Sequence, residues 1–337
     1  MQAFVLNRYG GAEATALAEV PQPPPGRGEV LIRVHAAGLN PVDYKTREGK
    51  LRAINSYTLP VVLGCELAGV VAALGEGAQG FSVGDRVMAR VAKQRLGAFA
   101  EFACVEADLV APMPATLDFE HAAALPLAGL TALQCLRDEL HVGKGSHVLI
   151  TGGAGGVGTY AIPIAKWLGA EVTTTASPRG EALVRSLGAD HVIDYTQQKL
   201  EDFARRFDAA LDLVGGETLP RLFGLVKPGG TVVSIAGTPE PQTARKDLHR
   251  GAGLAFLFWM ASFGLRAQAK KSGVTYRYLF MHPSGKELAE LAGLVDAGSL
   301  RVVLDKVFDF AQISDAFAYL EAGHAKGKVV VRMQASA

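Results

Sequence analysis

The 337-residue sequence has few cysteines, and their spacing excludes two common kinds of small scaffold. Cys65, Cys104 and Cys135 are odd in number, and no C-x-x-C pair occurs. A disulfide framework and a cysteine-rich zinc lobe both need closely spaced cysteine pairs, so neither is predicted. A reducing compartment fits these cysteines best.

The chain also lacks an excess of charge of either sign. Its 34 Lys and Arg residues nearly balance its 33 Asp and Glu residues, which gives a formal net charge of +1. A protein that binds nucleic acid or an anionic membrane through charge would show a basic patch. We therefore expect neither nucleic acid nor a membrane among its partners.

No apolar run is long enough to cross a bilayer. The longest, Ala252 to Leu265, is shorter than the about 20 residues that a spanning helix needs. Its aromatic part, Phe256–Phe263, is predicted to form a buried helix, a cover over a substrate cleft or a subunit contact. The first residues, Met1–Arg8, lack the charged start and long apolar run of a signal peptide, so we expect a cytoplasmic protein.

The chain is about twice the length of a common single domain, which predicts two domains. Its N-terminal part contains short apolar runs between turn clusters such as Pro21–Gly28 and Gly75–Gly80, a pattern typical of a β barrel or sandwich. After a predicted helix at Ser284–Ala297, the tail returns to β-rich character at Val302–Val307 and Lys328–Met333. We expect this tail to rejoin the first domain.

Between these parts, strands and helices alternate, which predicts an α/β fold with a parallel, doubly wound sheet. An apolar helical segment at Ala122–Leu140 comes first, and further helices are predicted at Arg179–Leu187 and Gly216–Val226. The predicted strands are His147–Thr151, Glu171–Thr175, His191–Tyr195, Ala209–Val214, Thr231–Ile235 and Tyr276–Phe280.

A glycine-rich loop, residues 153–158, follows the first of these strands and satisfies G-x-G-x-x-G. Gly153 permits a tight turn, Gly155 lets backbone N–H groups approach a pyrophosphate, and Gly158 lets the next helix pack close to the strand. The loop therefore predicts a dinucleotide site that also includes Gly156 and Val157. The alternative is a tight turn that is glycine-rich by coincidence. Within the next helix, Pro163 is expected to bend it or weaken a turn.

The residues after the second of these strands favour NADPH over NADH. An NAD site usually has an acidic residue there that binds the ribose hydroxyls, whereas this strand ends in Thr175-Ala176-Ser177-Pro178-Arg179. Ser177 can hydrogen-bond to a 2′-phosphate, and Arg179 can form an ion pair with it. The alternative is that Arg179 only faces solvent at the start of a helix.

Motifs along nearly the whole chain resemble one family, the zinc-independent medium-chain dehydrogenases/reductases, which comprise quinone oxidoreductases and alkenal (enone) reductases. The resemblance implies a GroES-like catalytic domain, residues 1–121 with 298–337, and a Rossmann NADPH-binding domain, residues 122–297. It also implies a homodimer. The matching segments are Ala37–Lys45, Gly64–Val71, Val83–Val87, Gly97–Glu101, Leu125–Ala132, Ser186–Asp190, Ile193–Tyr195 and His324–Val331.

The same resemblance argues against a metal. Zinc-using relatives place a Cys in the segment equivalent to Gly38–Asp43 and a His at the position of Cys65. This chain has Leu39 and Asn40 in that segment, and tetrahedral zinc needs three protein ligands. We therefore expect no metal and interpret Cys65 as a core-facing residue.

The resemblance further implies the roles of individual residues. Asn40, Asp43 and Thr131 are expected around the nicotinamide, and Lys328 is expected near the cofactor. Many family members have Lys where this chain has Gly180, so the preference for NADP depends on whether Arg179 replaces that lysine. The remaining cofactor contacts are expected from the glycine loop, Ser177, Tyr195, Val214 and Ala236.

Without a metal, reduction of an activated C=C bond needs less assistance than alcohol oxidation. Hydride goes to the β-carbon, charge develops on the carbonyl oxygen, and hydrogen-bond donors stabilise it. Tyr44 and Lys45 are the candidate donors; the alternatives are a packed tyrosine and a solvated lysine. The predicted function is reduction of small enones or alkenals by NADPH. Quinone reduction is one alternative, and a non-catalytic NADPH-binding structural or regulatory protein is another.

Overall fold

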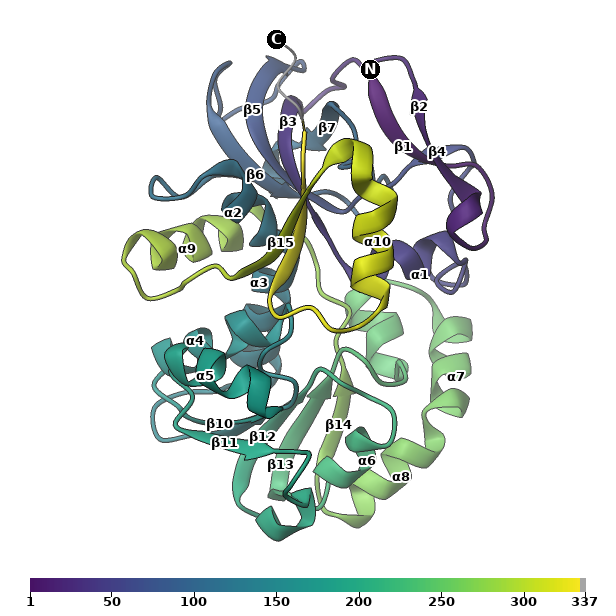
Figure 1. Cartoon of the computed structure of the whole chain (residues 1–337). Coiled ribbons are helices and arrows are strands. Elements are labelled where there is room, and N and C mark those ends of the chain that lie inside the picture. The colour runs from purple at the N-terminus through teal and green to yellow at the C-terminus, as the bar shows by residue number, and fades with distance from the viewer. Residues whose placement is uncertain (334–337) are drawn as a thin grey trace. The chain divides into compact units, whose positions relative to one another are not determined.

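The computed structural model describes residues 1–333, which fall into two units (Figure 1). Unit 1 consists of Met1–Leu130 with the described residues from Pro283 onward, and unit 2 is Thr131–His282. The observed boundaries differ from the predicted ones. Residues 122–130 and 283–297, assigned to the Rossmann domain from sequence, belong to unit 1.

Two helices explain this difference. Helix α2 (Phe119–Ala124) packs against strands β3 (Glu29–Leu39) and β5 (Glu66–Leu74). Helix α9 (Gly285–Asp296) packs against β8 (Val110–Pro112), and its Asp296 accepts hydrogen bonds from the backbone N–H groups of Ala115 and Thr116, both at 3.2 Å. Periodicity predicts such helices but not the sheet that each of them covers.

Unit 1 is built on a seven-stranded sheet to which the C-terminal tail contributes. Strand β16 (Lys328–Arg332) pairs antiparallel with β3 and parallel with β15 (Leu304–Asp309). The sheet order is β15-β16-β3-β5-β6-β8, and β7 also pairs with β3. The remaining strands of this sheet are β6 (Arg86–Arg90) and β7 (Phe102–Glu106). A separate three-stranded sheet contains β1 (Gln2–Leu6), β2 (Thr15–Glu19) and β4 (Val61–Val62).

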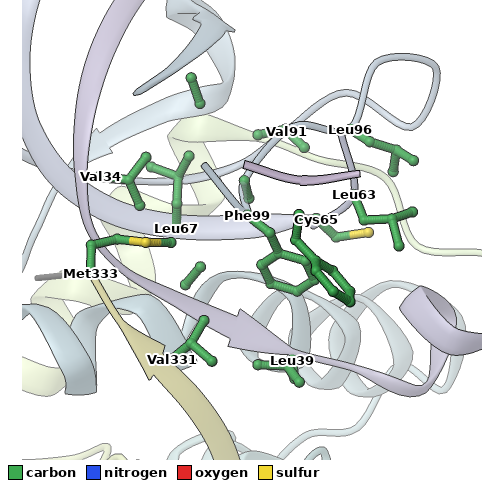
Figure 2. Packing of buried hydrophobic residues seen from close by; sticks show 14 of the residues in the cluster. Val34, Leu39, Leu63, Cys65, Leu67, Val91, Leu96, Phe99, Val331 and Met333 are labelled. Carbon is green, nitrogen blue, oxygen red and sulfur yellow. The ribbon is translucent and has the colours of Figure 1, made fainter. Parts of the chain in front are cut away.

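The core of unit 1 is an apolar cluster that holds Cys65. Figure 2 shows this side chain beside Leu63 and Phe99, with Leu39 of β3 and Val331 of β16 in the same cluster. Cys65 is 1% exposed, so it occupies a core position. Helices α1 (Pro41–Arg47) and α10 (Ile313–Glu321) complete the unit, with 3₁₀ turns at Ala12–Ala14, Ala107–Leu109 and Phe310–Gln312.

Unit 2 is a parallel six-stranded sheet in the order β11-β10-β9-β12-β13-β14, which confirms the predicted doubly wound α/β fold. All six predicted strands are present, with ends shifted by a few residues. They are β9 (His147–Ile150), β10 (Glu171–Ala176), β11 (His191–Asp194), β12 (Phe207–Asp212), β13 (Val226–Ser234) and β14 (Thr275–Tyr278).

The helices of this region differ more from prediction. The segment Ala122–Leu140 divides at Pro126 into α2 and α3 (Pro126–Leu133), because proline lacks the N–H that would continue the first helix. The helix predicted to reach Val226 ends at Leu222, since Val226 already begins β13. The unit contains π-helical turns at Gln134–Glu139 and Thr243–Asp247, a 3₁₀ turn at Leu200–Phe203, α4 (Gly158–Trp167), α5 (Pro178–Ser186), α6 (Thr218–Leu222), α7 (Ala252–Ala261) and α8 (Phe263–Lys271).

Two features of these helices bear on the predictions. Helix α4 continues through Pro163, whose neighbours Ile162 and Ile164 are fully buried, so packing holds the helix across the missing N–H. Helix α7, for which a buried core helix was one prediction, is instead largely exposed: Trp259 is 44% and Phe256 is 56% exposed. The buried-helix interpretation is therefore wrong.

Candidate active site

A buried polar cluster lies in unit 1 where β3 ends and where β5 and β16 begin. The Lys328 ammonium, on a residue 3% exposed, donates hydrogen bonds to the carbonyl oxygen of Leu39 at 3.0 Å and to Glu66 Oε1 at 2.7 Å. It also donates to Asn40 Oδ1, and Asn40 Nδ2 in turn donates to Glu66 Oε1 at 2.7 Å. The structure thus brings together Asn40 and Lys328, which sequence predicted, with Glu66, which it missed.

Glu66 is the anionic centre of this cluster. It is fully buried, and its second oxygen accepts a hydrogen bond from the backbone N–H of Leu127 at 2.6 Å. A buried carboxylate is stable only with such partners. A charged residue within the apolar stretch Gly64–Val71 is the one signal that could have revealed it.

Asp43, also predicted, lies beside this cluster. It is 1% exposed and accepts a hydrogen bond from the backbone N–H of Asn40 at 2.8 Å, which caps the start of α1. Burial raises the pKa of Asp43 to about 6, although hydrogen bonds from the Cys65 thiol and the Asn40 N–H oppose the rise. Asp43 is therefore a carboxyl group that exchanges its proton near neutral pH.

The raised pKa predicts a pH-dependent stability effect of Asp43→Asn. The folded protein holds the Asp43 proton more tightly than the unfolded chain does. The stability that comes from this tighter binding is fully present below about pH 4 and is lost as the pH rises through 6. Asparagine cannot ionise, and the variant should gain up to about 3 kcal/mol in free energy of unfolding at pH 8 relative to its gain at pH 4, at about 1.4 kcal/mol per pH unit. Urea unfolding at both pH values measures this; an equal change at both would contradict it.

Tyr44 and Lys45 follow Asp43 on α1 and remain partly exposed. Tyr44 also packs against the apolar core of unit 1, which agrees in part with the alternative of a packed tyrosine. Partial burial raises the pKa of Tyr44, so its phenol keeps its proton and can donate a hydrogen bond.

In unit 2 the glycine loop connects β9 to α4, as predicted. A Cβ at Gly158 would lie 2.5 Å from the carbonyl oxygen of Gly152 and 2.6 Å from that of Gly153, so only glycine allows this approach of helix to strand. The left-handed residue of the turn is Gly152, with a φ of 65°, rather than Gly153. Gly153 is required for another reason, because a Cβ there would collide with Thr174.

Several predicted cofactor residues follow the carboxyl ends of the parallel strands, where open α/β sheets bind their ligands. Ser177 follows β10 and is partly exposed, whereas Tyr195 after β11 and Val214 after β12 are 58% and 54% exposed. Ala236 follows β13. Thr131, by contrast, is buried in α3 at the first residue of unit 2.

A buried network that sequence missed holds two of these loops. Asp212 Oδ2 accepts a hydrogen bond from Ser234 Oγ at 2.7 Å, and its other oxygen accepts one from the backbone N–H of Val214 at 3.2 Å. Ser234 Oγ in turn accepts a hydrogen bond from the backbone N–H of Ala236 at 3.1 Å. Polar residues that end the apolar strands β12 and β13 are the signal for this network.

Arg179 is exposed in the first turn of α5, two residues after Ser177. Gly180, where many relatives have Lys, is buried, and a Cβ there would lie 3.0 Å from that of Ala154 in the glycine loop. A lysine at 180 would therefore press on the loop, whereas the neighbouring Arg179 is exposed.

Within residues 1–333, no group of three or more His, Cys, Asp or Glu side chains is arranged to hold a metal ion. Burial also raises the pKa of the Cys65 thiol well above its usual value, which opposes the thiolate that zinc requires. The Lys328 ammonium is the cation that balances Glu66 at this place.

Comparisons with known proteins agree with this architecture. The model of the alcohol dehydrogenase GroES-like domain matches residues 26–115, and that of the zinc-binding dehydrogenase matches residues 187–331. Two relatives, each 36% identical over 98% of this chain, are the mitochondrial NAD(P)H oxidoreductase RTN4IP1 of Danio rerio and the chloroplastic NADPH-dependent alkenal/one oxidoreductase of Arabidopsis thaliana. The matches cover 91% and 79% of those proteins.

Among solved structures, the quinone oxidoreductase from Coxiella burnetii is similar over 99% of both chains, with 32% identity and a TM-score of 0.85. Sequence identity of this extent over nearly the whole chain is sufficient to assign the protein family. The chain belongs to the medium-chain dehydrogenase/reductase family.

Proposed function

We propose that this protein is an NADPH-dependent oxidoreductase that reduces the C=C bond of small α,β-unsaturated carbonyl compounds without a metal. The observation that carries the proposal is the buried cluster of Asn40, Glu66 and Lys328, in which the Lys328 ammonium donates a hydrogen bond to the Glu66 carboxylate beside the start of α1. The relative named as an NADPH-dependent alkenal/one oxidoreductase supports the same reaction.

The residues of unit 2 fit a bound dinucleotide. Because Gly158 has no side chain, α4 begins close to the strand that precedes it. The loop and the N-terminus of α4 would together hold the pyrophosphate. Ser177 and Arg179 would bind the 2′-phosphate, and Tyr195, Val214 and Ala236 would line the remainder of the cofactor. When bound, NADPH supplies the hydride that adds to the β-carbon of the substrate.

The side chains of unit 1 differ in what they offer to the substrate. The polar atoms of Asn40 and Lys328 are already engaged in the buried cluster, so these residues position the backbone at the start of α1. Tyr44 and Lys45 are partly exposed on that helix and would donate hydrogen bonds to the carbonyl oxygen. Asp43, which is buried and accepts a hydrogen bond from the backbone N–H of Asn40, would hold the start of α1 in place for these donors.

Arg179 sets the expected choice between NADPH and NADH. Replacing it with alanine removes the ion pair with the 2′-phosphate but leaves the loop that holds the pyrophosphate. We expect the KM for NADPH to rise about tenfold, as for loss of a charge-assisted hydrogen bond, with the KM for NADH nearly unchanged. Steady-state kinetics with both cofactors measures this, with the exposed Arg185→Ala of the same helix as the matched control. A parallel rise for both cofactors would contradict the assignment.

The reaction is tested by following NADPH oxidation in the presence of a chelator with a short enone, a quinone and a saturated aldehyde in parallel. Fast turnover of the enone but not the aldehyde is the expected result. Faster turnover of the quinone would favour the second candidate, which the similarity to the Coxiella burnetii quinone oxidoreductase supports. Tight NADPH binding without turnover of any acceptor would overturn both.

We also propose that the protein is a cytoplasmic homodimer. Strand β14 is the last strand of the unit 2 sheet, and an edge strand of this kind can pair with its counterpart in a second copy. The three free cysteines favour a reducing compartment. Analytical ultracentrifugation and cell fractionation test the two parts separately.

A further inference from the structure

Helix α7 presents an exposed apolar surface that the proposed reaction does not use. Four of its large side chains are between 44% and 56% exposed, and the aromatic rings of Phe256 and Trp259 stack with centroids 5.9 Å apart. Phe263, the first residue of α8, continues this surface and is 58% exposed. We call this surface the α7 patch; it comprises Phe256, Leu257, Trp259, Met260 and Phe263. Within the described residues, no helix is long and apolar enough to cross a membrane.

The helix touches its own unit through a narrow strip. Ala255 is 2% exposed and Ser262 is fully buried, whereas the residues between them and on either side are mostly exposed. A helix that is apolar on all sides is normally buried. A contiguous exposed patch of this kind marks a binding surface.

Basic residues flank the α7 patch on both sides. The segment 243–271 contains six Lys or Arg residues and one acidic residue, Asp247, which is buried and paired with Arg277. The flanks pack against α7, the preceding one through Thr243–Asp247 and the following one through α8 (Figure 1). The basic residues are Arg245, Lys246, Arg250, Arg266, Lys270 and Lys271; all are exposed except Arg266, which is partly exposed. The Lys246 ammonium forms an ion pair with Glu139 at 2.6 Å, so the attraction rests on the other five.

We propose that α7 binds the surface of an anionic phospholipid bilayer, with the α7 patch among the upper acyl chains and the basic flanks at the headgroups. Segments that lie in a membrane interface combine aromatic and leucine side chains with Lys and Arg. Here the apolar side chains lie mainly on α7 and the basic ones on its two flanks. Each basic residue near an anionic surface adds to the attraction. A second copy fits this face less well, because pairing through it would bring two basic flanks together.

The test follows the fluorescence of Trp259 in full-length protein that carries Trp167→Phe, since these are the two tryptophans of the chain. Vesicles of phosphatidylcholine alone are compared with vesicles that also contain phosphatidylglycerol. We expect a blue shift and co-sedimentation with the anionic vesicles, and weaker binding at high salt.

Two variants and one control separate the components of this binding. Phe256→Glu combined with Met260→Glu should weaken vesicle binding by about tenfold or more, because two apolar side chains that would insert into the bilayer are removed. Lys270→Glu combined with Lys271→Glu should weaken binding to anionic vesicles only. Val83→Glu, at an apolar residue 66% exposed in unit 1, should leave binding unchanged, and turnover of a water-soluble enone should be the same in all of them.

Three outcomes would overturn the proposal. One is the absence of binding to either kind of vesicle, and another is binding that the Phe256→Glu/Met260→Glu variant does not weaken. The third is a difference in oligomeric state in lipid-free buffer, with the unmodified protein forming a larger species and that variant a monomer. This outcome would assign the face to a second copy.

Discussion

Replacing Arg277 with methionine is expected to cause the largest loss of stability of any single change described here. Its guanidinium, on a residue 3% exposed, bonds to Glu139 at 3.1 Å, to Glu240 at 3.0 Å and to Asp247. The substitution leaves the buried carboxylates of Glu240 and Asp247 without their cation, and leaves Glu139 with Lys246 alone. Removing one partner of a buried ion pair costs about 3–5 kcal/mol, and we expect a loss at or above the upper end of this range.

Urea unfolding near neutral pH, monitored by circular dichroism, measures this loss. The control is Lys246→Met, which removes an exposed cation from the same Glu139 and should cost less than about 1 kcal/mol. Similar losses for the two variants would show that burial of Arg277 is not what matters.

Lys328→Met should have the second-largest effect, since it leaves the fully buried Glu66 carboxylate with Asn40 and the Leu127 N–H as its polar partners. The expected loss is about 3–5 kcal/mol in free energy of unfolding near neutral pH. Thermal and urea unfolding measure it, and the methionine side chain keeps most of the lysine volume, so packing changes little.

The double variant Glu66→Gln/Lys328→Met distinguishes charge from packing. If the loss comes from an uncompensated buried charge, removing that charge should restore most of the stability. Additive losses from the two substitutions would instead show that each side chain is held for its shape. The relevant distances, 2.7 Å from Lys328 to Glu66 and 2.7 Å from Asn40 to Glu66, favour the first outcome.

The sequence was sufficient to predict the doubly wound sheet, because buried parallel strands are short apolar runs that glycines and helices separate. The six strands of unit 2 lie where this pattern places them. The return of the C-terminal tail to unit 1 was expected from its β-rich character, and the GroES-like identity of that unit from motifs that resemble a known family. The partners of α2 and α9 were not predictable, since an amphipathic helix fits the face of either sheet.

The candidate site could likewise be predicted only in part. The glycine loop is a local pattern, so the sequence predicts it, whereas Asn40 was expected at the site only from the resemblance to a known family. The contact of Glu66 with Lys328 joins residues 262 positions apart, and the carboxylates around Arg277 come from three separate segments. No local pattern encodes such contacts. Exposure of α7 was unpredictable for the opposite reason, because its composition is that of a core helix.

The burial of the cysteines has a consequence for an enzyme that handles electrophiles. Conjugated carbonyl compounds alkylate thiolates, and the thiolate is the reactive form of cysteine. Cys65 and Cys135 are at most 1% exposed, burial raises the pKa of both thiols, and Cys104 is also buried. Burial of all three thiols therefore limits their alkylation by the substrates of such an enzyme.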